Sequence, residues 1–385
     1  MLDHKEILDL RSKHLGPSLS VSYDEPLHIV RGEGQYLFDA KGNRYLDCVN
    51  NIQHVGHCHP KVVEAAQQQY KKLNTNTRYL DATIVNYAKN ITSTLPAGLE
   101  VCFFTNSGSE ANDLALRLAR QFTGSKATIV LDGAYHGNLS SLIEISSYKH
   151  NGPGGSGTPD HVHVIPIPDQ YRGKYRGEEC SEQYVQEVQN AIETIQNNDK
   201  NVSAFIAEAL MGCGGQLMLP KGFLKESFTK IKNAVGVCIA DEIQIGFGRM
   251  GSHFWGFESE GAIPDIVTMG KSMGNGHPLS AVVTTRKIAD SFNNGMEYFN
   301  SFGGNPVSCA VGQAVLDVIK EEGLQENALK VGSYLLDQLK NLQNQHDLIG
   351  EVRGRGLFIG IELVKDELAP ATAESQTIVN HMKDK

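Results

Sequence analysis

The sequence lacks both the long apolar run of a membrane protein and the excess of positive charge of a nucleic-acid-binding protein. No stretch of its 385 residues approaches the roughly 20 consecutive apolar residues that a membrane-spanning helix requires. Its 35 Lys and Arg residues are outnumbered by 44 Asp and Glu residues, giving a formal net charge of −9 at pH 7. Nucleic acids and anionic lipid surfaces attract basic proteins, so neither is expected as a partner.

Cysteine is scarce and shows no pairing pattern. The seven cysteines are odd in number, form no CxxC motif and mostly fall in apolar stretches, which indicates buried thiols in a reducing compartment. The first 17 residues have no hydrophobic signal-peptide core, and their acids argue against a transit peptide. An intracellular location is therefore expected.

A complete metal site is also missing. Three histidines and one cysteine lie within residues 54–59, but metal sites with this spacing normally need a second group of ligands elsewhere, and none is evident. No metal is predicted.

From residue 101 onward, short apolar runs alternate with helical patterns, as in α/β folds with a parallel sheet. The runs that indicate strands are 101–105, 127–132, 202–209, 235–240, 266–269 and 279–285. Helical patterns cover 2–14, 60–73, 110–122, 187–197, 306–322 and 324–346, and paired strand-like runs cover 35–47 and 350–362.

Two charged residues stand directly after two of these apolar runs. The run 235–240 ends at Asp241, and the run 266–269 leads to Lys271. Ligands of an open parallel sheet bind beyond the carboxyl ends of its strands, so both charges are expected where a ligand binds. Pyridoxal phosphate needs a lysine to bind its aldehyde and a carboxylate to keep its pyridine nitrogen protonated. Taken singly, each residue also fits an exposed surface position.

The wider motif resembles the class III aminotransferases of fold type I, which are pyridoxal phosphate enzymes. The matching strings are ADEIQIGFGR at 240–249, PDI at 264–266 and MGK at 269–271. The resemblance implies that Asp241 meets the pyridine nitrogen, Gln244 lies near the ring hydroxyl and Lys271 carries the cofactor. It also implies an α/β fold with a large domain, whose mostly parallel seven-stranded-type sheet is flanked by helices, and a smaller α+β domain.

The same resemblance predicts how the chain is divided. Residues 1–52 would give the N-terminal segment and hairpin of the small domain, residues 53–305 the large cofactor-binding domain, and residues 306–385 the C-terminal part of the small domain. The chain ends before the family pattern does, so the small domain is expected to be shortened.

A turn of small polar residues at 106–109 precedes the helical pattern 110–122. Ser109 would be a suitable N-cap, and Glu110 would complement the positive end of the helix. Such a turn offers N–H groups and hydroxyls to a phosphate, although a simple helix cap has the same pattern. Because the turn matches the phosphate loop of the family, the resemblance implies that Ser107, Gly108 and Ser109 bind the cofactor phosphate.

The resemblance implies four further cofactor-binding residues. Tyr135 follows a strand, where an aromatic ring can stack on a planar ligand or simply pack at the rim, and the family match favours stacking, with His136 beside it. Glu208 ends another strand near the cofactor. Ser301 stands where the family generally has threonine, whose hydroxyl reaches the cofactor phosphate of the neighbouring subunit, so a homodimer with shared active sites is implied.

Four cations are candidates for binding an anionic substrate. Arg78 lies in a polar segment that either contributes to the active site or only connects helices. Lys174 and Arg176 belong to the cationic and aromatic run 168–176, which fits a solvated loop or a binding site for a dianion. The resemblance implies that Arg353 clamps a substrate carboxylate.

The resemblance is most specific at residues 73–78, 171–176 and 269–278, which are similar to ethanolamine-phosphate and 5-phosphohydroxy-L-lysine phospho-lyases. These enzymes are relatives of the alanine–glyoxylate aminotransferases. The predicted function is elimination of phosphate from a phosphorylated amine, giving an aldehyde, ammonia and phosphate. Amino transfer of the alanine–glyoxylate type and a catalytically impaired binding protein are the alternatives. The family suggests a mitochondrial location, with the cytosol as the alternative.

Overall fold

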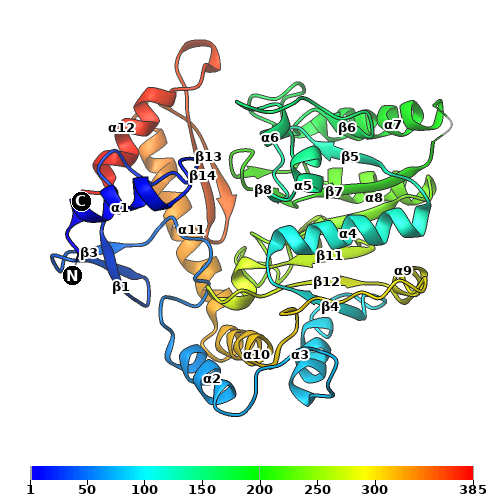
Figure 1. The fold of residues 1–385 in the computed structure, drawn as a ribbon. Helices are drawn as coiled ribbons and strands as arrows, with labels where there is room; N and C mark the ends of the chain where they lie inside the picture. Colours follow the sequence, from blue (N-terminus) through cyan, green and yellow to red (C-terminus); the bar gives the residue numbers. More distant parts are fainter. Residues whose placement is uncertain (1, 199, 385) are drawn as a thin grey trace.

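A mixed sheet forms the centre of the molecule in the computed structural model, which describes residues 2–198 and 200–384 (Figure 1). In this described part the sheet has seven strands in the order β4-β12-β11-β10-β7-β5-β6. β12 runs antiparallel to both of its neighbours, β4 and β11, and the other pairs of this sheet are parallel. The strands are β4 Val101–Thr105, β5 Ala127–Leu131, β6 Val162–Ile165, β7 Val202–Ala207, β10 Val237–Asp241, β11 Ile266–Met269 and β12 Ser280–Thr284. The predicted fold class is confirmed.

The two faces of the sheet pack into separate hydrophobic cores, which explains why its strands are apolar without interruption. In β10, Val237 and Ile239 lie in the core that contains the apolar face of α4 (Gly108–Thr123). Cys238 and Ala240 lie in the other core, with residues of α7 (Ser181–Gln196) and α8 (Phe223–Asn233). Each strand residue thus alternates between two helical layers.

The two ends of the described chain lie side by side, apart from the sheet (Figure 1). The N-terminal part holds α1 (His4–His14) and a three-stranded antiparallel sheet of β1 Ile29–Glu33, β2 Tyr36–Asp39 and β3 Arg44–Leu46. The C-terminal part holds α11 (Leu324–Gln343), the hairpin of β13 (Ile349–Arg355) and β14 (Phe358–Leu363), and α12 (Thr372–Met382). The backbone N–H of Asp24 donates to Asn380 Oδ1 at 2.9 Å. The domain boundaries at residues 52 and 305 stay predictions.

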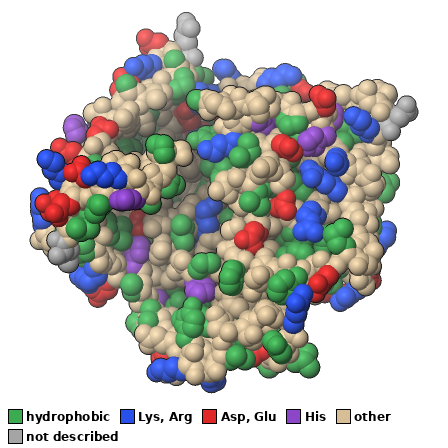
Figure 2. Space-filling model, in the orientation of Figure 1, with side chains coloured by type: hydrophobic (Ala, Val, Ile, Leu, Met, Phe, Trp, Pro, Cys, Tyr) green, Lys and Arg blue, Asp and Glu red, His purple; other side chains and the backbone are tan. Residues whose placement is uncertain are grey.

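The remaining elements connect these parts. Helices α2, α3 and α10 pack together below the sheet in the view of Figure 1. The surface is hollowed between the part that carries the chain ends and the part that carries the sheet (Figure 2). The connecting elements are α2 Pro60–Tyr70, α3 Ala82–Thr92, α5 Ser140–Ile145, α6 Ser147–His150, α9 Arg286–Phe292, α10 Pro306–Glu321, β8 Leu210–Met211 and β9 Leu217–Met218, with short 3-10 helices at Glu178–Cys180, Gly256–Glu260, Lys271–Gly274 and Asp366–Leu368.

Several details differ from the sequence-based predictions. Strands β1 and β6 were not predicted, nor were helices α3, α8 and α12. The run 235–240 was predicted to start at Val235, but Val235 is exposed with φ of 60° and the strand begins at Val237. The cysteines were predicted to be buried, but Cys48, Cys58 and Cys213 are exposed, because they lie in loops outside the strands and helices.

All seven cysteines are free. Among the described residues, no helix is both long enough and apolar enough to span a bilayer.

Gly332 of α11 sets how closely the β13–β14 hairpin approaches this helix. A Cβ atom at this position would overlap the carbonyl oxygen of Gly356, in the hairpin turn. Gly356 in turn faces the backbone of Met250. Helix, hairpin and the loop around Met250 are therefore packed backbone to backbone.

We expect Gly332→Ala to lower the free energy of unfolding by about 1–3 kcal/mol, because the added methyl group meets backbone that cannot rotate away. The measurement is the midpoint of urea unfolding. Gly16→Ala is the matched control, since its new Cβ has one neighbour, at 4.0 Å. Equal midpoints for the two variants would contradict the close packing.

Candidate active site

Lys271, Asp241 and the start of α4 meet at the carboxyl edge of the sheet. Asp241 is the last residue of β10, and Lys271 follows the end of β11 after Gly270. A Cβ on Gly270 would lie 2.7 Å from Ser280 Oγ and 3.5 Å from the Cα of Gly108, so glycine is needed for this close approach. Lys271 is half-buried and has a φ of 32°, a backbone conformation that residues with a side chain rarely adopt. Such strained conformations are common at functional sites.

Three donors fix the buried carboxylate of Asp241. Its Oδ2 accepts hydrogen bonds from His136 Nδ1 and Asn112 Nδ2, both at 2.8 Å, and its Oδ1 accepts from the N–H of Ile243 at 3.1 Å. His136 and Asn112 are themselves buried. The sequence analysis missed Asn112, although a polar residue within the apolar face of the helical pattern 110–122 was a signal that could have found it.

The next residue, Glu242, points to the opposite side from Asp241, because successive residues of a strand face opposite sides. Its two oxygens accept hydrogen bonds from the N–H groups of Gly256 and Phe257 at 2.8 and 2.9 Å. Burial raises the pKa of Glu242 to about 8. Of the two acids, only Asp241 bonds to His136 and Asn112.

Glu208 and Gln244 form a second polar group beside Asp241. Glu208 Oε1 accepts from the N–H of Gly212 at 3.3 Å and from Gln244 Nε2 at 3.5 Å. Its Oε2 is buried and has no partner among the described residues. Burial and the nearby charge of Asp241 raise the pKa of Glu208 well above its ordinary value, which favours the neutral form of this carboxyl.

The residues of the predicted phosphate loop lie at the start of α4. Ser107, and not Ser109, is the N-cap, since its extended backbone lets its hydroxyl accept from the N–H of Glu110 at 3.2 Å. Ser109 Oγ instead donates to Asn138 Oδ1 at 2.9 Å and accepts from the Asn138 N–H at 3.1 Å. A Cβ on Gly108 would lie 2.7 Å from Ile243 Cδ1, so the helix start packs against the residue bonded to Asp241.

These residues fit pyridoxal phosphate as a group. Lys271 offers an amine, Asp241 an oriented carboxylate, and α4 an N-terminus with exposed Ser107. The unpartnered Oε2 of Glu208 and Nε2 of His136 are buried polar atoms that a polar ligand can satisfy.

Tyr135 is half-buried, with its ring edge-on to Tyr148 at 6.2 Å between centroids. Ser301 is exposed and follows Asn300, which bonds to Asn106 and Glu110 at the start of α4. The predicted cofactor contacts of both residues remain proposals.

The structure separates the four candidate substrate cations. Arg78 is exposed and paired with Glu297 at 2.9 Å. Lys174 is exposed and paired with Glu187 of α7 at 2.6 Å, and Arg176 is exposed with Nε bonded to the carbonyl oxygen of Gly173 at 3.4 Å. Arg353 is buried in the β13–β14 hairpin.

The histidines of residues 54–59 have separate partners. His54 Nε2 lies 2.7 Å from the carbonyl oxygen of Phe247, His57 Nε2 lies 2.8 Å from Asp47, and His59 Nε2 lies 3.1 Å from Glu322. Residues 2–198 and 200–384 contain no group of three or more His, Cys, Asp or Glu placed to hold a metal ion.

Comparisons with known proteins agree with this arrangement. A family model described as Aminotransferase class-III matches residues 19–385. A Drosophila melanogaster protein named alanine–glyoxylate aminotransferase 2-like is 51% identical over 391 residues, which cover 99% of this chain and 79% of that protein. A Caenorhabditis elegans protein named ethanolamine-phosphate phospho-lyase homolog 1 is 45% identical over 376 residues, which cover 94% of this chain and 80% of that protein.

Among solved structures, a phospholyase from Arthrobacter in complex with phosphoethanolamine matches with a TM-score of 0.93 and 41% identity, covering 98% of this chain and 90% of that chain. Further matches from Homo sapiens and Arabidopsis thaliana carry the word mitochondrial in their names.

We expect the two neighbouring carboxyls to respond differently to amide substitution. Asp241→Asn should weaken binding of pyridoxal phosphate at least about tenfold, since the amide adds an N–H where the pyridine nitrogen needs an acceptor. Glu208→Gln should keep the dissociation constant within about threefold, because the raised pKa of Glu208 favours a neutral side chain, which the amide resembles. Absorbance titration of the apoprotein measures both constants. An equal loss in Glu208→Gln would mean that Glu208 acts as an anion.

Proposed function

Because this chain belongs to the class III aminotransferase family and its cofactor is pyridoxal 5′-phosphate, we propose that it is a phospho-lyase acting on a phosphorylated amine. The substrate class comprises ethanolamine phosphate and 5-phosphohydroxy-L-lysine, and the products are an aldehyde, ammonia and inorganic phosphate. The observation that carries the proposal is the likeness, over nearly the whole chain, to the Arthrobacter phospholyase in complex with phosphoethanolamine.

Lys271 and Asp241 carry the chemistry in this proposal. The bound cofactor supplies a ring that accepts electrons from the substrate carbon. Lys271 would hold the cofactor aldehyde, and its amine, when free, would be placed to take a proton from the substrate carbon that bears nitrogen. Asp241, oriented by His136 and Asn112, would keep the pyridine nitrogen protonated.

Elimination then follows on the next substrate carbon. Its carbon–oxygen bond breaks, and the electron pair leaves with the phosphate. Water hydrolyses the remaining enamine to the aldehyde and ammonia, so the reaction consumes no keto acid. Phosphate is a far better leaving group than hydroxide, which favours elimination over return of a proton to the cofactor.

Amino transfer of the alanine–glyoxylate type is the second candidate. The name of the Drosophila melanogaster relative, an aminotransferase, favours this reaction. That relative is 51% identical to this chain, against 45% for the Caenorhabditis elegans relative. The two reactions begin with the same proton removal by Lys271 and differ in whether a phosphate can leave.

We also propose that the protein is a homodimer whose subunits share active sites. The segments 78–85 and 296–302 expose large apolar side chains, including Tyr79, Leu80 and Phe302, and are joined by the pair of Arg78 and Glu297. An apolar surface of this kind supports an interface. Ser301 lies within it, so its hydroxyl would reach the phosphate loop of the partner subunit.

A mitochondrial location is proposed because two relatives carry that word in their names. Co-fractionation of the native protein with cytosolic and not with mitochondrial markers would overturn it.

We expect the holoprotein to release inorganic phosphate and ammonia from ethanolamine phosphate or 5-phosphohydroxy-L-lysine without added keto acid. Lys271→Ala should abolish release, because no other described residue holds an amine at this position, whereas Lys287→Ala, on the exposed surface of α9, should retain it. Phosphate and ammonia are assayed with and without pyruvate or glyoxylate. Turnover only with the keto acid, with alanine or glycine formed in step, would replace the lyase by the aminotransferase.

We expect Leu80→Asp to convert the dimer to monomers and to lower cofactor retention, because a charge would be buried in the apolar interface. Val235→Asp is the control, since Val235 is also exposed but lies just before β10, outside the segments 78–85 and 296–302. Sedimentation velocity measures the assembly. A monomeric wild type, or a Leu80→Asp variant that stays dimeric, would contradict the proposed interface.

A further inference from the structure

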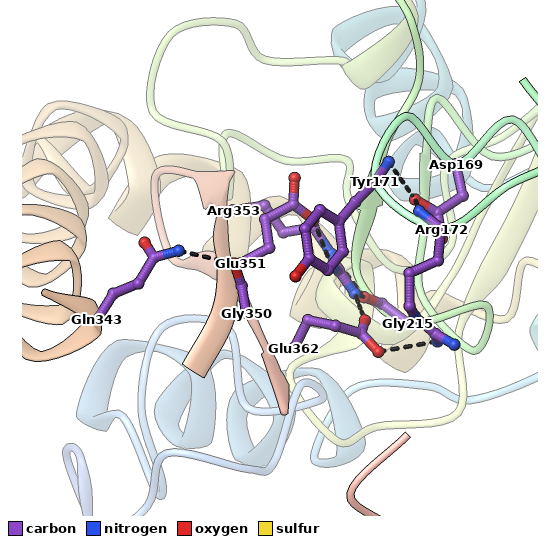
Figure 3. A network of polar contacts seen from close by, with 9 residues as sticks. All are labelled: Asp169, Tyr171, Arg172, Gly215, Gln343, Gly350, Glu351, Arg353 and Glu362. Carbon is purple, nitrogen blue, oxygen red and sulfur yellow. Dashed lines mark hydrogen bonds and ion pairs between the residues drawn. The ribbon is translucent and has the colours of Figure 1, made fainter. Parts of the chain in front are cut away.

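Arg353, a predicted substrate-binding cation, is bound within the protein (Figure 3). Its Nη1 donates to Glu351 Oε2 and its Nη2 donates to Glu362 Oε2, both at 2.6 Å. Its Nε and Nη2 also donate to the carbonyl oxygen of Gly215, at 3.1 and 2.6 Å. Two of the other three predicted cations are likewise paired with glutamates. A substrate phosphate therefore gains little from these three cations, because carboxylates already offset their charge.

Lys149 of α6 differs from these cations because aromatic rings, and not acids, surround its ammonium. Its Nζ lies 5.7 Å from the centroid of the Tyr135 ring and 5.3 Å from that of Tyr148. Both distances fall within the range of about 6 Å over which an aromatic ring attracts a cation. Lys149 is exposed, and within residues 2–198 and 200–384 no carboxylate pairs with it. Its charge and its three N–H donors are therefore available to an anion.

Three short hydrogen bonds connect the backbone of Lys149 to Asp241. Asp241 Oδ2 accepts from His136 Nδ1 at 2.8 Å, and the N–H of His136 donates to Ser146 Oγ at 2.9 Å. The N–H of Lys149 in turn donates to the carbonyl oxygen of Ser146 at 2.8 Å. Helix α6 is therefore fixed beside the turn that carries Tyr135 and His136, at the carboxyl edge of the sheet.

The loop of residues 212–214 packs against both sides of the candidate active site. A Cβ on Gly212 would lie 2.5 Å from Gln244 Nε2. A Cβ on Gly133, two residues before Tyr135, would lie 3.6 Å from the Cα of Gly214. The loop therefore bridges the residue predicted to lie near the cofactor ring and the turn next to α6.

The charges of two lysines reach the thiol of Cys213, in the middle of this loop. Burial and the charge of Glu208 raise the pKa of Cys213, while the charges of Lys271 and Lys149 act in the opposite direction. Charges at a hydrated site are largely screened beyond about 10 Å. Lys271 and Lys149 therefore lie near the same thiol, so a small substrate held at Lys271 has a free cation nearby.

We propose that Lys149 binds the phosphate of the substrate, its ammonium donating hydrogen bonds to the phosphate oxygens while the substrate amine lies at Lys271. The inference rests on the proposed function and adds the residue that recognises a phosphorylated amine. Hydrogen bonds between an ammonium and a phosphate are stronger than those between neutral groups. Negative charge grows on the phosphate as its bond to carbon breaks, so the same ammonium stabilises the leaving group.

Binding is tested apart from turnover with 3-aminopropylphosphonate. A methylene group replaces the bridging oxygen of ethanolamine phosphate in this compound, so no phosphate can leave. We expect Lys149→Met to raise its dissociation constant for the holoprotein about tenfold to a hundredfold, because a charge-assisted hydrogen bond is lost. Lys149→Arg, which keeps the cation, should stay within about fivefold of the wild type. Isothermal titration calorimetry measures both constants.

Two controls make the result specific to a phosphate at Lys149. Butylamine has the same chain without the phosphonate, so Lys149→Met should change its dissociation constant less than about threefold. Lys287→Met removes another exposed lysine, whose Nζ lies 5.1 Å from the centroid of the Phe122 ring, and should leave phosphonate binding unchanged. An equal loss for butylamine in Lys149→Met, or for the phosphonate in Lys287→Met, would overturn the proposal.

The cofactor is a second source of phosphate, and the apoprotein distinguishes it from the substrate. We expect Lys149→Met to keep the dissociation constant for pyridoxal phosphate within about threefold, because the start of α4 is the proposed site of that phosphate. Absorbance titration of the apoprotein measures it. A loss as large as that for the phosphonate would assign Lys149 to the cofactor phosphate and overturn the proposal.

Turnover separates this proposal from the lyase assignment. In phosphate release from ethanolamine phosphate, Lys149→Met should lower kcat/KM about a hundredfold, through a higher KM and a lower kcat. If the wild type releases no phosphate, the lyase assignment fails, and phosphonate binding alone decides the role of Lys149. If the wild type does not bind the phosphonate, or Lys149→Met binds it equally well, the proposal is overturned even where phosphate is released.

Discussion

The burial of one carboxylate, Asp241, is the constraint on which the rest of the site depends. A charge in the interior costs several kcal/mol unless donors surround it, and here the donors come from α4, from the loop after β5 and from the turn after β10. Binding Asp241 therefore ties three separate segments to the edge of the sheet. The same charge raises the pKa of Glu208, which makes two adjacent acids chemically different.

The charged residues around Arg353 offset the free-energy cost of burial in another way. Arg353 and Glu362 are deeply buried, yet each meets opposite charge from within the chain. Asp241 is held by His136, Asn112 and the N–H of Ile243, and the buried Nε2 of His136 and Oε2 of Glu208 have no partner among the described residues. The group around Arg353 is complete in itself, whereas the group around Asp241 has buried polar atoms that a ligand can satisfy.

The sequence predicted the strands and the two charges at their ends because both signals are local. Continuous apolar runs such as 101–105 and 266–269 mark strands buried on both faces, and the residues after them fall at one edge. Asn112, the N-cap role of Ser107 and the partners of Arg353 were not predicted. The contact of Asn112 with Asp241 joins residues 129 positions apart, which periodicity does not contain. The N-cap bond of Ser107 with Glu110 and the bonds of Arg353 to Glu351 and Glu362 are local, but they depend on side-chain orientations that residue types alone do not give. The three exposed cysteines were missed because apolar neighbours do not show whether a loop is covered.

The strand order determines when the site can assemble. Strand β4, at the edge of the sheet, pairs only with β12, about 180 positions later in the chain. The turn after β4 leads into α4, which holds Ser107 and Asn112. During synthesis on the ribosome, this edge has no partner until residue 284 has left the exit tunnel, so the start of α4, where the phosphate loop is proposed, is completed after most of the chain exists. Capture of the cofactor is therefore a late step in the biogenesis of this protein.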